Sequence, residues 1–483
     1  MILPRQTDAK SLNNPIRLVT FWLSATLTVS GRDSRGRPPA WMSGDAFVSA
    51  EENGDPAAAP DLFRWLSREV RELMPREVPV LEKPPTALEF SRDFVAANRP
   101  CVVRGAVDHW PARELWTAPY LSAALGDTPV SVNVTPTGLG DALLSTEGTD
   151  LRFRGGEDAK ARGSARETSS ASSPARPPLV FVQPEARRMR FSEFMKLVSQ
   201  DIASRENRHA GTGDTHTRVF DSRAPREIAY VSAQDDSFSA EFASALSADL
   251  RGAAASGIDW ARDAFGCAPD AVNLWCGPRD AVTSFHRDHY ENVYVVLAGC
   301  KTFTLLPPCD AWRMESRDAP SARFEYRDER SQECSRSDDM DVVSRVNTEN
   351  DENDEHDEND GTRTSVCQKS CRVVVETPIA NVSWPSATPS SVRRDGGPPA
   401  FVVTLSAGET LYLPAMWYHH VEQGRCPNEA ENDADDDSRQ YTIAVNFWHD
   451  MRFDDRFATA RFLETARERE TRALGGTRET YLK

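Results

Sequence analysis

The chain has 483 residues, enough for more than one domain, with a formal net charge of −17 and 39% hydrophobic residues. This acidic balance argues against sequence-independent binding to nucleic acid, which needs a basic surface. We expect no membrane association, because no segment reaches the roughly 18 apolar residues of a membrane span. Nine cysteines without a Cys-x-x-Cys motif favour a reducing compartment. We therefore expect a cytoplasmic protein, leave the nucleus open and do not expect secretion.

Residues 1–59 are rich in Ser, Gly, Pro and Ala without sustained periodicity, so we expect a disordered N-terminal extension. Leu18–Val29 superficially resembles the apolar core of a signal peptide, but its serines and threonines favour a dispensable segment. From about residue 60, apolar residues recur at helical spacing. We expect residues 60–250 to form helices and strands that pack on the core, with a disordered insertion at 154–178.

Between residues 251 and 452 the chain carries many short β-forming runs, among them AVNLWCG, VYVVLAG, KTFTLLP, AFVVTL, TLYLP and YTIAVNFW. Such runs, separated by turn residues, are typical of a β sandwich or jelly roll. Two polar insertions interrupt them, an acidic one at 321–370 and a shorter one at 427–438. We expect residues 453–483 to form a helix with one apolar face, which either caps the β core or contacts a second subunit in a homodimer.

His286 and Asp288 form a His-x-Asp pair just before a β-forming run. Residues two apart on an extended segment point to the same side, so the two side chains can converge on one point. Imidazole and carboxylate are two ligands of a facial metal site, and a second histidine completes it. His419, which precedes His420 far downstream in LYLPAMWYHH, is the candidate and must come from another strand. An isolated histidine is more often structural, but this combination favours a metal site.

A facial site of this kind leaves positions for a chelating 2-oxo acid and for dioxygen, as in non-haem Fe(II) oxygenases. The 2-oxo acid also needs a cation for its distal carboxylate. Lys301, within the apolar run CKTFTLL, is the candidate, because an unpaired buried ammonium is costly. The alternative is an edge-strand lysine that faces water. Hydroxyl and amide groups for the same ligand are available from Thr283, Tyr230, Asn292 and Asn446.

The stretches VTSFHRDHYEN, YLPAMWYHHV and VNFW together resemble the JmjC-domain 2-oxoglutarate oxygenases of the small, hydroxylase-type branch. Stretches such as EKPPTALEF, VSVNVTPTGLGDAL, PEARRMRFSEF and PDAVNLWCG extend the resemblance over most of the chain outside the insertions. Within the family, the chain is most similar to the cytosolic lysyl (3S)-hydroxylases that are also described as histone-tail endopeptidases. The resemblance implies a mainly β fold with flanking helices on a double-stranded β-helix, the jelly roll of cupin-like JmjC proteins.

The resemblance also implies roles for single residues. It makes His286, Asp288 and His419 the Fe(II) ligands, with His420 as second choice, because the first histidine of the family's His-His pair binds the metal. It makes Lys301 the partner of the 5-carboxylate of 2-oxoglutarate. The other implied pocket residues are Thr283 and Tyr230, which assist Lys301, Asn292 and Asn446, which line the pocket, and Trp448, which walls it.

The implied reaction is C3-hydroxylation of a lysine side chain in a protein, with Fe(II), 2-oxoglutarate and O2. In the family, developmentally regulated GTP-binding proteins are such substrates. One alternative is a JmjC demethylase or endopeptidase acting on histone tails; the chain shows no chromatin-reading module, which favours the hydroxylase. Another is a metal-binding cupin without oxygenase activity, in which Lys301 and the Asn446-Phe-Trp448 run would have no purpose.

Overall fold

The computed structural model describes residues 62–145, 151–153, 179–206, 225–234, 236–328, 369–424 and 441–473. The chain divides at residue 62 into two units, and every described residue except Leu62 belongs to the second. Several sequence expectations lie outside the described residues: the extension at 1–59 with its signal-like segment, and the insertions at 154–178 and 427–438.

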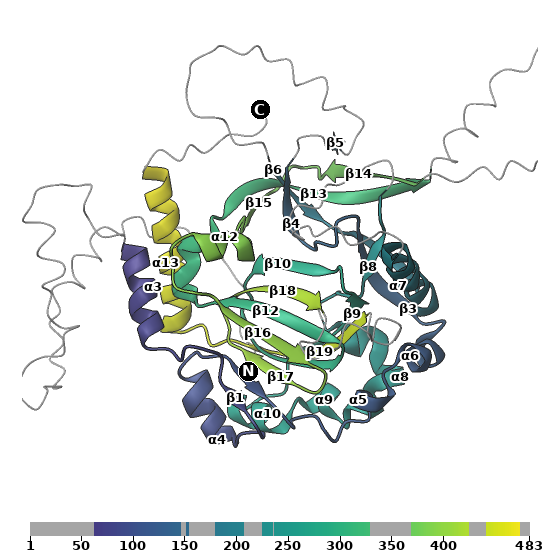
Figure 1. Ribbon diagram of the computed structural model, residues 1–483, viewed down its shortest axis with the longest axis horizontal. Helices are drawn as coiled ribbons and strands as arrows, with labels where there is room; N and C mark the ends of the chain where they lie inside the picture. The colour runs from purple at the N-terminus through teal and green to yellow at the C-terminus, as the bar shows by residue number, and fades with distance from the viewer. Residues whose placement is uncertain are drawn as a thin grey trace, which may run out of the picture. The chain divides into compact units, whose positions relative to one another are not determined.

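Two antiparallel sheets form the double-stranded β-helix (Figure 1). The smaller sheet has the strand order β10 (Val282–His286), β18 (Tyr418–Gly424), β12 (Cys300–Leu306) and β16 (Phe401–Ser406). The larger sheet contributes β17 (Thr410–Leu413), β11 (Tyr290–Ala298), β19 (Tyr441–Asp450) and β9 (Ala271–Pro278). Two short strands, β1 (Val80–Leu81) and β2 (Cys101–Val103), extend it beyond β17. The expected jelly-roll core is therefore confirmed.

The larger sheet is buried on both faces, which is why its strands read as almost continuous apolar runs. Along β11, Val293 belongs to the apolar cluster shared with the helices, and Tyr294 to the cluster between the two sheets. Phe303 of β12 also belongs to the cluster between the sheets. Because side chains alternate along a strand, Asn292 and Lys301, each two residues away from these inner residues, face the same interior.

A third sheet covers the open end of the β10–β18–β12–β16 sheet and lies above β10 in Figure 1. Its order is β4 (Ala142–Ser145), β6 (Leu179–Gln183), β13 (Arg317–Asp328), β14 (Lys369–Val375) and β5 (Leu151–Phe153), and β15 (Asn381–Trp384) pairs with β13. A three-stranded sheet is formed by β7 (Glu185–Arg190), β3 (Pro129–Thr135) and β8 (Ile228–Tyr230).

The stretch 321–370, expected to be an insertion, begins and ends as strand. β13 extends to Asp328 and pairs with β14 in register from Ala322↔Val375 to Asp328↔Lys369. Ala322 and Phe324 are buried, and charged residues alternate with them. That alternation belongs to a strand with one solvated face, which composition alone does not separate from a polar loop. Residues 329–368 lie outside the described part of the chain.

Helices cover the outer face of the larger sheet and one end of the barrel. The α-helices are α3 (Leu62–Glu72), α4 (Ala87–Phe90), α5 (Ala112–Leu115), α6 (Ala118–Leu125), α7 (Phe191–Glu206), α8 (Ala243–Leu246), α9 (Ala253–Ser256), α10 (Asp259–Phe265), α12 (Pro389–Arg394) and α13 (Asp455–Ala473). Two π-helices are η3 (Ser91–Val95) and η6 (Phe238–Phe242), and two 3-10 helices are η7 (Ser247–Leu250) and η8 (Pro308–Met314). Among the described residues, no helix is long and apolar enough to span a membrane.

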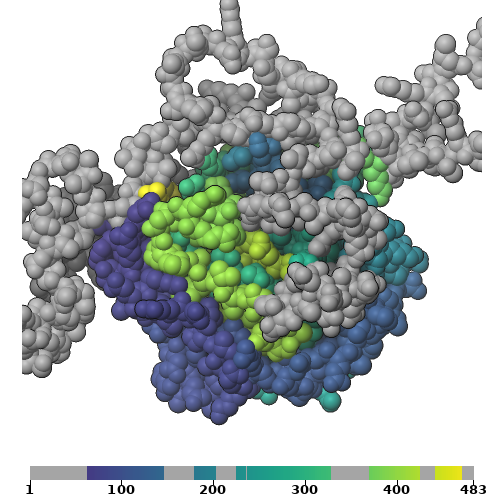
Figure 2. All heavy atoms as spheres, viewed as in Figure 1, coloured from purple at the N-terminus to yellow at the C-terminus, as the bar shows by residue number. Residues whose placement is uncertain are grey.

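The helix expected near the C-terminus is α13, which runs beside α3 (Figure 1). The Arg467 guanidinium lies 5.7 Å from the centre of the Phe63 ring. Arg64 of α3 donates to the carbonyl of Asp395, the residue after α12, at 2.9 Å. Figure 2 shows the purple N-terminal segment in contact with the light-green segment that contains α12. Phe453 and Phe462 are more than half exposed. A homodimer through α13 stays a prediction.

Five of the six described cysteines are free, and Cys300 takes part in a disulfide. One cysteine therefore departs from the reduced set that the cysteine pattern led us to expect.

Candidate functional site

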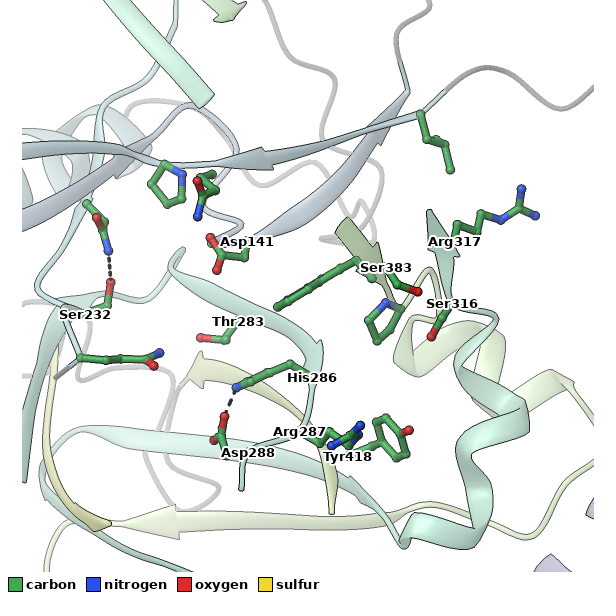
Figure 3. Close-up of a pocket in the computed structure, with 18 of the residues that line it drawn as sticks. Asp141, Ser232, Thr283, His286, Arg287, Asp288, Ser316, Arg317, Ser383 and Tyr418 are labelled. Carbon is green, nitrogen blue, oxygen red and sulfur yellow. Dashed lines mark hydrogen bonds and ion pairs between the residues drawn. The ribbon is translucent and has the colours of Figure 1, made fainter. Parts of the chain in front are cut away.

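His286, Asp288 and His419 converge at the mouth of the barrel. His286 ends β10 and lies directly opposite His419 of β18 in the strand register. The Nε2 atoms of His286 and His419 lie 3.9 Å and 3.5 Å from the Asp288 Oδ2. One ligand atom from each residue lies within 4.8 Å of the others, as expected for a metal-binding triad. Figure 3 shows His286 and Asp288 facing each other.

We expected Asp288 to lie on the same strand as His286. It lies instead in the connection between β10 and β11. A backbone hydrogen bond fixes this connection, because the Met416 N–H donates to the Asp288 carbonyl at 2.9 Å. Met416 itself has a positive φ of 69° in the turn before β18. The buried Glu291 holds that turn by accepting from the Tyr412 hydroxyl at 2.7 Å and the Ala415 N–H at 3.2 Å.

Both histidines present an Nε2 lone pair to the shared point. The Nδ1 of His286 donates to the Ser284 carbonyl at 2.8 Å, and that of His419 to the Trp417 carbonyl at 3.0 Å. A carbonyl can only accept, so Nδ1 carries the proton and Nε2 is free to bind a metal. Burial, together with the neighbouring His286, lowers the pKa of His419 to about 4. His419 is therefore neutral at physiological pH.

His420, the second choice, points elsewhere. Successive residues of β18 face opposite sides, and the His420 ring lies 5.4 Å from the ring of Phe285 in a cluster behind the sheet. His420 is buried and does not line the cavity that His286 and His419 share.

Glu464 of α13 joins the two strands that carry the histidines. Its carboxylate accepts two hydrogen bonds from the guanidinium of Arg287, the residue between His286 and Asp288. It also accepts from the hydroxyl of Tyr418, the residue before His419, at 2.6 Å. One carboxylate on the C-terminal helix therefore fixes both segments that carry the triad residues, and it does so from the side of the groove.

With the exception of the second choice, His420, all nine predicted site residues line one small inner cavity of about 30 Å³ between the two sheets. At its inner end, Lys301 is 1% exposed and donates to the Tyr230 hydroxyl at 2.9 Å. Its ammonium also lies 5.4 Å and 5.7 Å from the ring centres of Tyr230 and Tyr294. Burial lowers the pKa of Lys301 to about 7, and no carboxylate of the described residues pairs with it. Such an ammonium favours an anionic ligand.

Amide groups form the side of the cavity. The Trp275 Nε1–H donates to Asn446 Oδ1 at 2.8 Å, and Asn446 Nδ2 donates to Asn292 Oδ1 at 3.2 Å. Trp448 stacks on Tyr290 at 4.6 Å between ring centres. The Trp448 Nε1–H is buried and has no hydrogen-bond partner among the described residues. A buried donor without a partner is costly, so this N–H is available to a ligand.

The sequence analysis missed five residues of this cavity: Gln234, Trp275, Tyr294, Phe303 and Val421. Tyr294 and Phe303 each lie two residues after a predicted pocket residue on the same strand. The period of two along a strand could have indicated them. Gln234 follows the short strand β8 and gave no such signal.

The inner cavity opens into a wide groove of about 1530 Å³ beneath the third sheet. His286 and Asp288 line both spaces, whereas His419 lines the inner cavity, so the triad lies where the cavity meets the groove. The other shared residues are Tyr230, Gln234, Trp275 and Thr283. Asp141 and Trp384, neither predicted from sequence, lie in the groove wall. Burial raises the pKa of Asp141, and nearby His286 opposes that shift.

Comparisons with known proteins agree with this geometry. A model of the cupin-like domain family matches residues 87–455. The chain is 32% identical to the lysine-specific demethylase JMJ32 of Arabidopsis thaliana, over 83% of this chain and 90% of that protein. It is 31% identical to the human bifunctional peptidase and (3S)-lysyl hydroxylase JMJD7, over 86% of this chain and 95% of that protein. A third relative, 27% identical over 88% of this chain and 96% of its own length, is JmjC domain-containing protein E of Dictyostelium discoideum. With its facing histidines, its buried lysine and these relatives, the chain belongs to the cupin-like JmjC family.

Proposed function

We propose that this protein is an Fe(II)- and 2-oxoglutarate-dependent protein hydroxylase that acts on C3 of a lysine side chain. Members of the JmjC family generally use Fe(II) and 2-oxoglutarate. The observation that carries the proposal is the combination, in one cavity, of the His286–Asp288–His419 triad with a buried Lys301 that has no carboxylate partner among the described residues.

The donor set suits a ferrous ion. Two neutral imidazoles and one carboxylate occupy one face of an octahedral metal and leave the other positions to co-substrate and dioxygen. His286, Asp288 and His419 would hold the metal through Nε2, Oδ2 and Nε2. When bound, the metal and 2-oxoglutarate supply oxidative decarboxylation to succinate and CO2 and the transfer of one oxygen atom to a substrate C–H bond.

The chain's own residues suit the co-substrate as well. Lys301 would pair with the 5-carboxylate, and the Tyr230 hydroxyl, already bonded to the ammonium, would hold it in place together with Thr283. Trp448 offers an indole N–H to which no described residue is hydrogen-bonded, and Asn292 with Asn446 lines the side of the same cavity. Aromatic walls around these groups exclude water, which strengthens the ion pair.

The substrate proposal is a protein that presents a lysine, such as a developmentally regulated GTP-binding protein. Its support is the similarity to the (3S)-lysyl hydroxylase among the relatives. The similarity to a lysine-specific demethylase makes demethylation of a methylated lysine the second candidate reaction. The name of the human relative includes a peptidase activity, so cleavage of the peptide chain is the third. A metal-binding cupin without oxygenase activity would leave Lys301 without an anionic ligand. We expect cytoplasmic activity and no direct contact with nucleic acid.

The experiment is incubation of the purified protein with Fe(II), 2-oxoglutarate and lysine peptides from candidate GTP-binding proteins. We expect iron-dependent formation of succinate and a lysine that gains the mass of one oxygen atom. Loss of methyl groups from a methylated peptide, or cleavage of the peptide, would replace the hydroxylase proposal by one of its alternatives. Absence of succinate with every peptide would contradict the oxygenase proposal itself.

A further inference from the structure

The groove beside the triad contains the carboxylate of Asp141, with which no described residue pairs. The Asp141 side chain lines the groove just before β4, and Figure 3 shows its carboxylate directed into the open space above Thr283 and His286. Among the described residues, no hydrogen bond or ion pair reaches this carboxylate. A partly buried carboxylate without a partner favours a cationic group in the groove.

The backbone of Asp141 is fixed to the strand that carries His286. The Val282 N–H of β10 donates to the Gly138 carbonyl at 2.8 Å, and the Gly140 N–H donates to the Val282 carbonyl at 2.9 Å. The Ser284 hydroxyl donates to the Asp141 carbonyl. These bonds use backbone atoms of residues 138–141, so the Asp141 carboxylate is held near the triad while its own oxygens stay available.

An aromatic ring lines the same groove as this carboxylate. Trp384, the last residue of β15, lines the same groove and donates from Nε1 to the Ser284 hydroxyl at 3.0 Å. Its ring lies parallel to the His286 ring, 6.4 Å away with 6° between the planes, and packs on Phe181 at 4.9 Å. Ser284 thus joins the Trp384 ring to the Asp141 backbone. A carboxylate and an aromatic ring that line one groove can bind an organic cation together.

We propose that Asp141 and Trp384 form a subsite for the primary ammonium group of the substrate side chain. This inference rests on the proposed function and names the residues that would recognise its lysine. An ammonium offers N–H donors to the carboxylate and a charge to the ring. A trimethylated ammonium has no hydrogen-bond donors and is typically bound by a cage of several aromatic rings. The aromatic ring of the groove that stacks on His286 is that of Trp384. The guanidinium of Arg317, across the groove, points away from His286 in Figure 3.

The first test measures binding apart from turnover. The probes are n-butylammonium, a mimic of the lysine side-chain end, and neutral n-butanol, each titrated calorimetrically into the full chain with Fe(II) and 2-oxoglutarate under nitrogen. We expect the wild type to bind the ammonium at least about tenfold more tightly than the alcohol, and Asp141→Asn to abolish that preference. Asp318→Asn, which removes an exposed carboxylate of the same groove, should keep it. An Asp141→Asn protein that still prefers the ammonium overturns the inference.

The second test uses a peptide that the wild type hydroxylates. Asp141→Asn should raise the KM for the peptide at least about tenfold and change the KM for 2-oxoglutarate less than about twofold, because the carboxylate lies in the groove and not beside Lys301. Trp384→Phe should keep part of the affinity and Trp384→Ala lose it. A purely structural role would move both KM values together and would refute the subsite. If the wild type forms no succinate with any peptide, the proposed function fails, whereas the calorimetry still decides the subsite.

Discussion

Replacing Lys301 by methionine should have opposite effects on stability and on co-substrate binding. Burial lowers the pKa of the Lys301 ammonium to about 7 in the fold, from its ordinary value of 10.5. The unfolded chain therefore binds more protons than the folded chain between these values, and the free energy of unfolding of the wild type rises with pH across that window. At pH 7 the shift corresponds to an unfavourable contribution on the order of 4 kcal/mol, which Lys301→Met removes.

The same substitution removes the proposed partner of the 5-carboxylate. Loss of one member of a buried charge pair typically costs about 2 to 4 kcal/mol, so the KM for 2-oxoglutarate should rise roughly 30- to 1,000-fold. Thermal unfolding without ligand at pH 7 and pH 9, together with succinate formation against 2-oxoglutarate concentration, measures both effects. We expect a higher Tm than the wild type at pH 7, a smaller gain at pH 9, and a much higher KM.

Lys196→Met is the matched control, because Lys196 is an exposed lysine of α7 remote from the cavity. It should change neither the Tm nor the KM appreciably. The reasoning is refuted if Lys301→Met lowers the Tm at pH 7 and leaves the KM for 2-oxoglutarate within about twofold of the wild type. That result would mean that the lysine is structural and that another group binds the co-substrate.

Three further predictions concern the residues around the triad. His419→Ala should abolish tight Fe(II) or Mn(II) binding, measured by equilibrium dialysis, whereas His420→Ala should retain it, because that ring lies behind the sheet; equal losses would reverse the assignment. Glu464→Gln removes the negative charge that holds both Arg287 and Tyr418, so the metal affinity should fall about tenfold while the far-UV circular dichroism spectrum is unchanged. An unaltered metal affinity would show that α13 does not position the triad. Gly138→Ala places a Cβ 2.0 Å from the Asp280 carbonyl oxygen at a φ of +81°, so the free energy of unfolding should fall by more than 2 kcal/mol, approximately, by urea denaturation. Gly252→Ala, with φ +89° and no atom within 4 Å of the new Cβ, should cost only about 1 kcal/mol; equal losses would mean that the close approach of this loop to β10 is unimportant.

Much of the inner cavity follows from local sequence. A strand buried on both faces is apolar along its whole length, so a polar residue within it, such as Asn292, Asn446 or Lys301, stands out as one that needs a partner. The period of two then places each of these side chains on a definite face once one neighbour is known. The histidine of the downstream strand could be predicted for the same reason, because His419 occurs in an equally apolar run.

The arrangement across strands depends on the register, which local sequence does not contain. In β10, Thr283 opposes Val421 and His286 opposes His419, so three steps along one strand match two along the other. Strict alternation would place Thr283 and His286 on opposite faces of the strand. Because of this irregularity, both side chains point into the same cavity. It also explains why Asp288 reaches the triad from beyond the end of the strand.

What the sequence by itself determined is the set of candidate site residues and the type of fold that holds them, because hydrophobic periodicity and unusual polar residues are local properties. The tertiary structure alone decided which other groups lie around the triad. Three segments far apart in the sequence contribute Asp141, Trp384 and Glu464. No local sequence pattern distinguishes any of the three from its neighbours. Their positions follow from strand pairing, a tight glycine turn and helix packing, which act between residues that are far apart in sequence and so leave no local pattern.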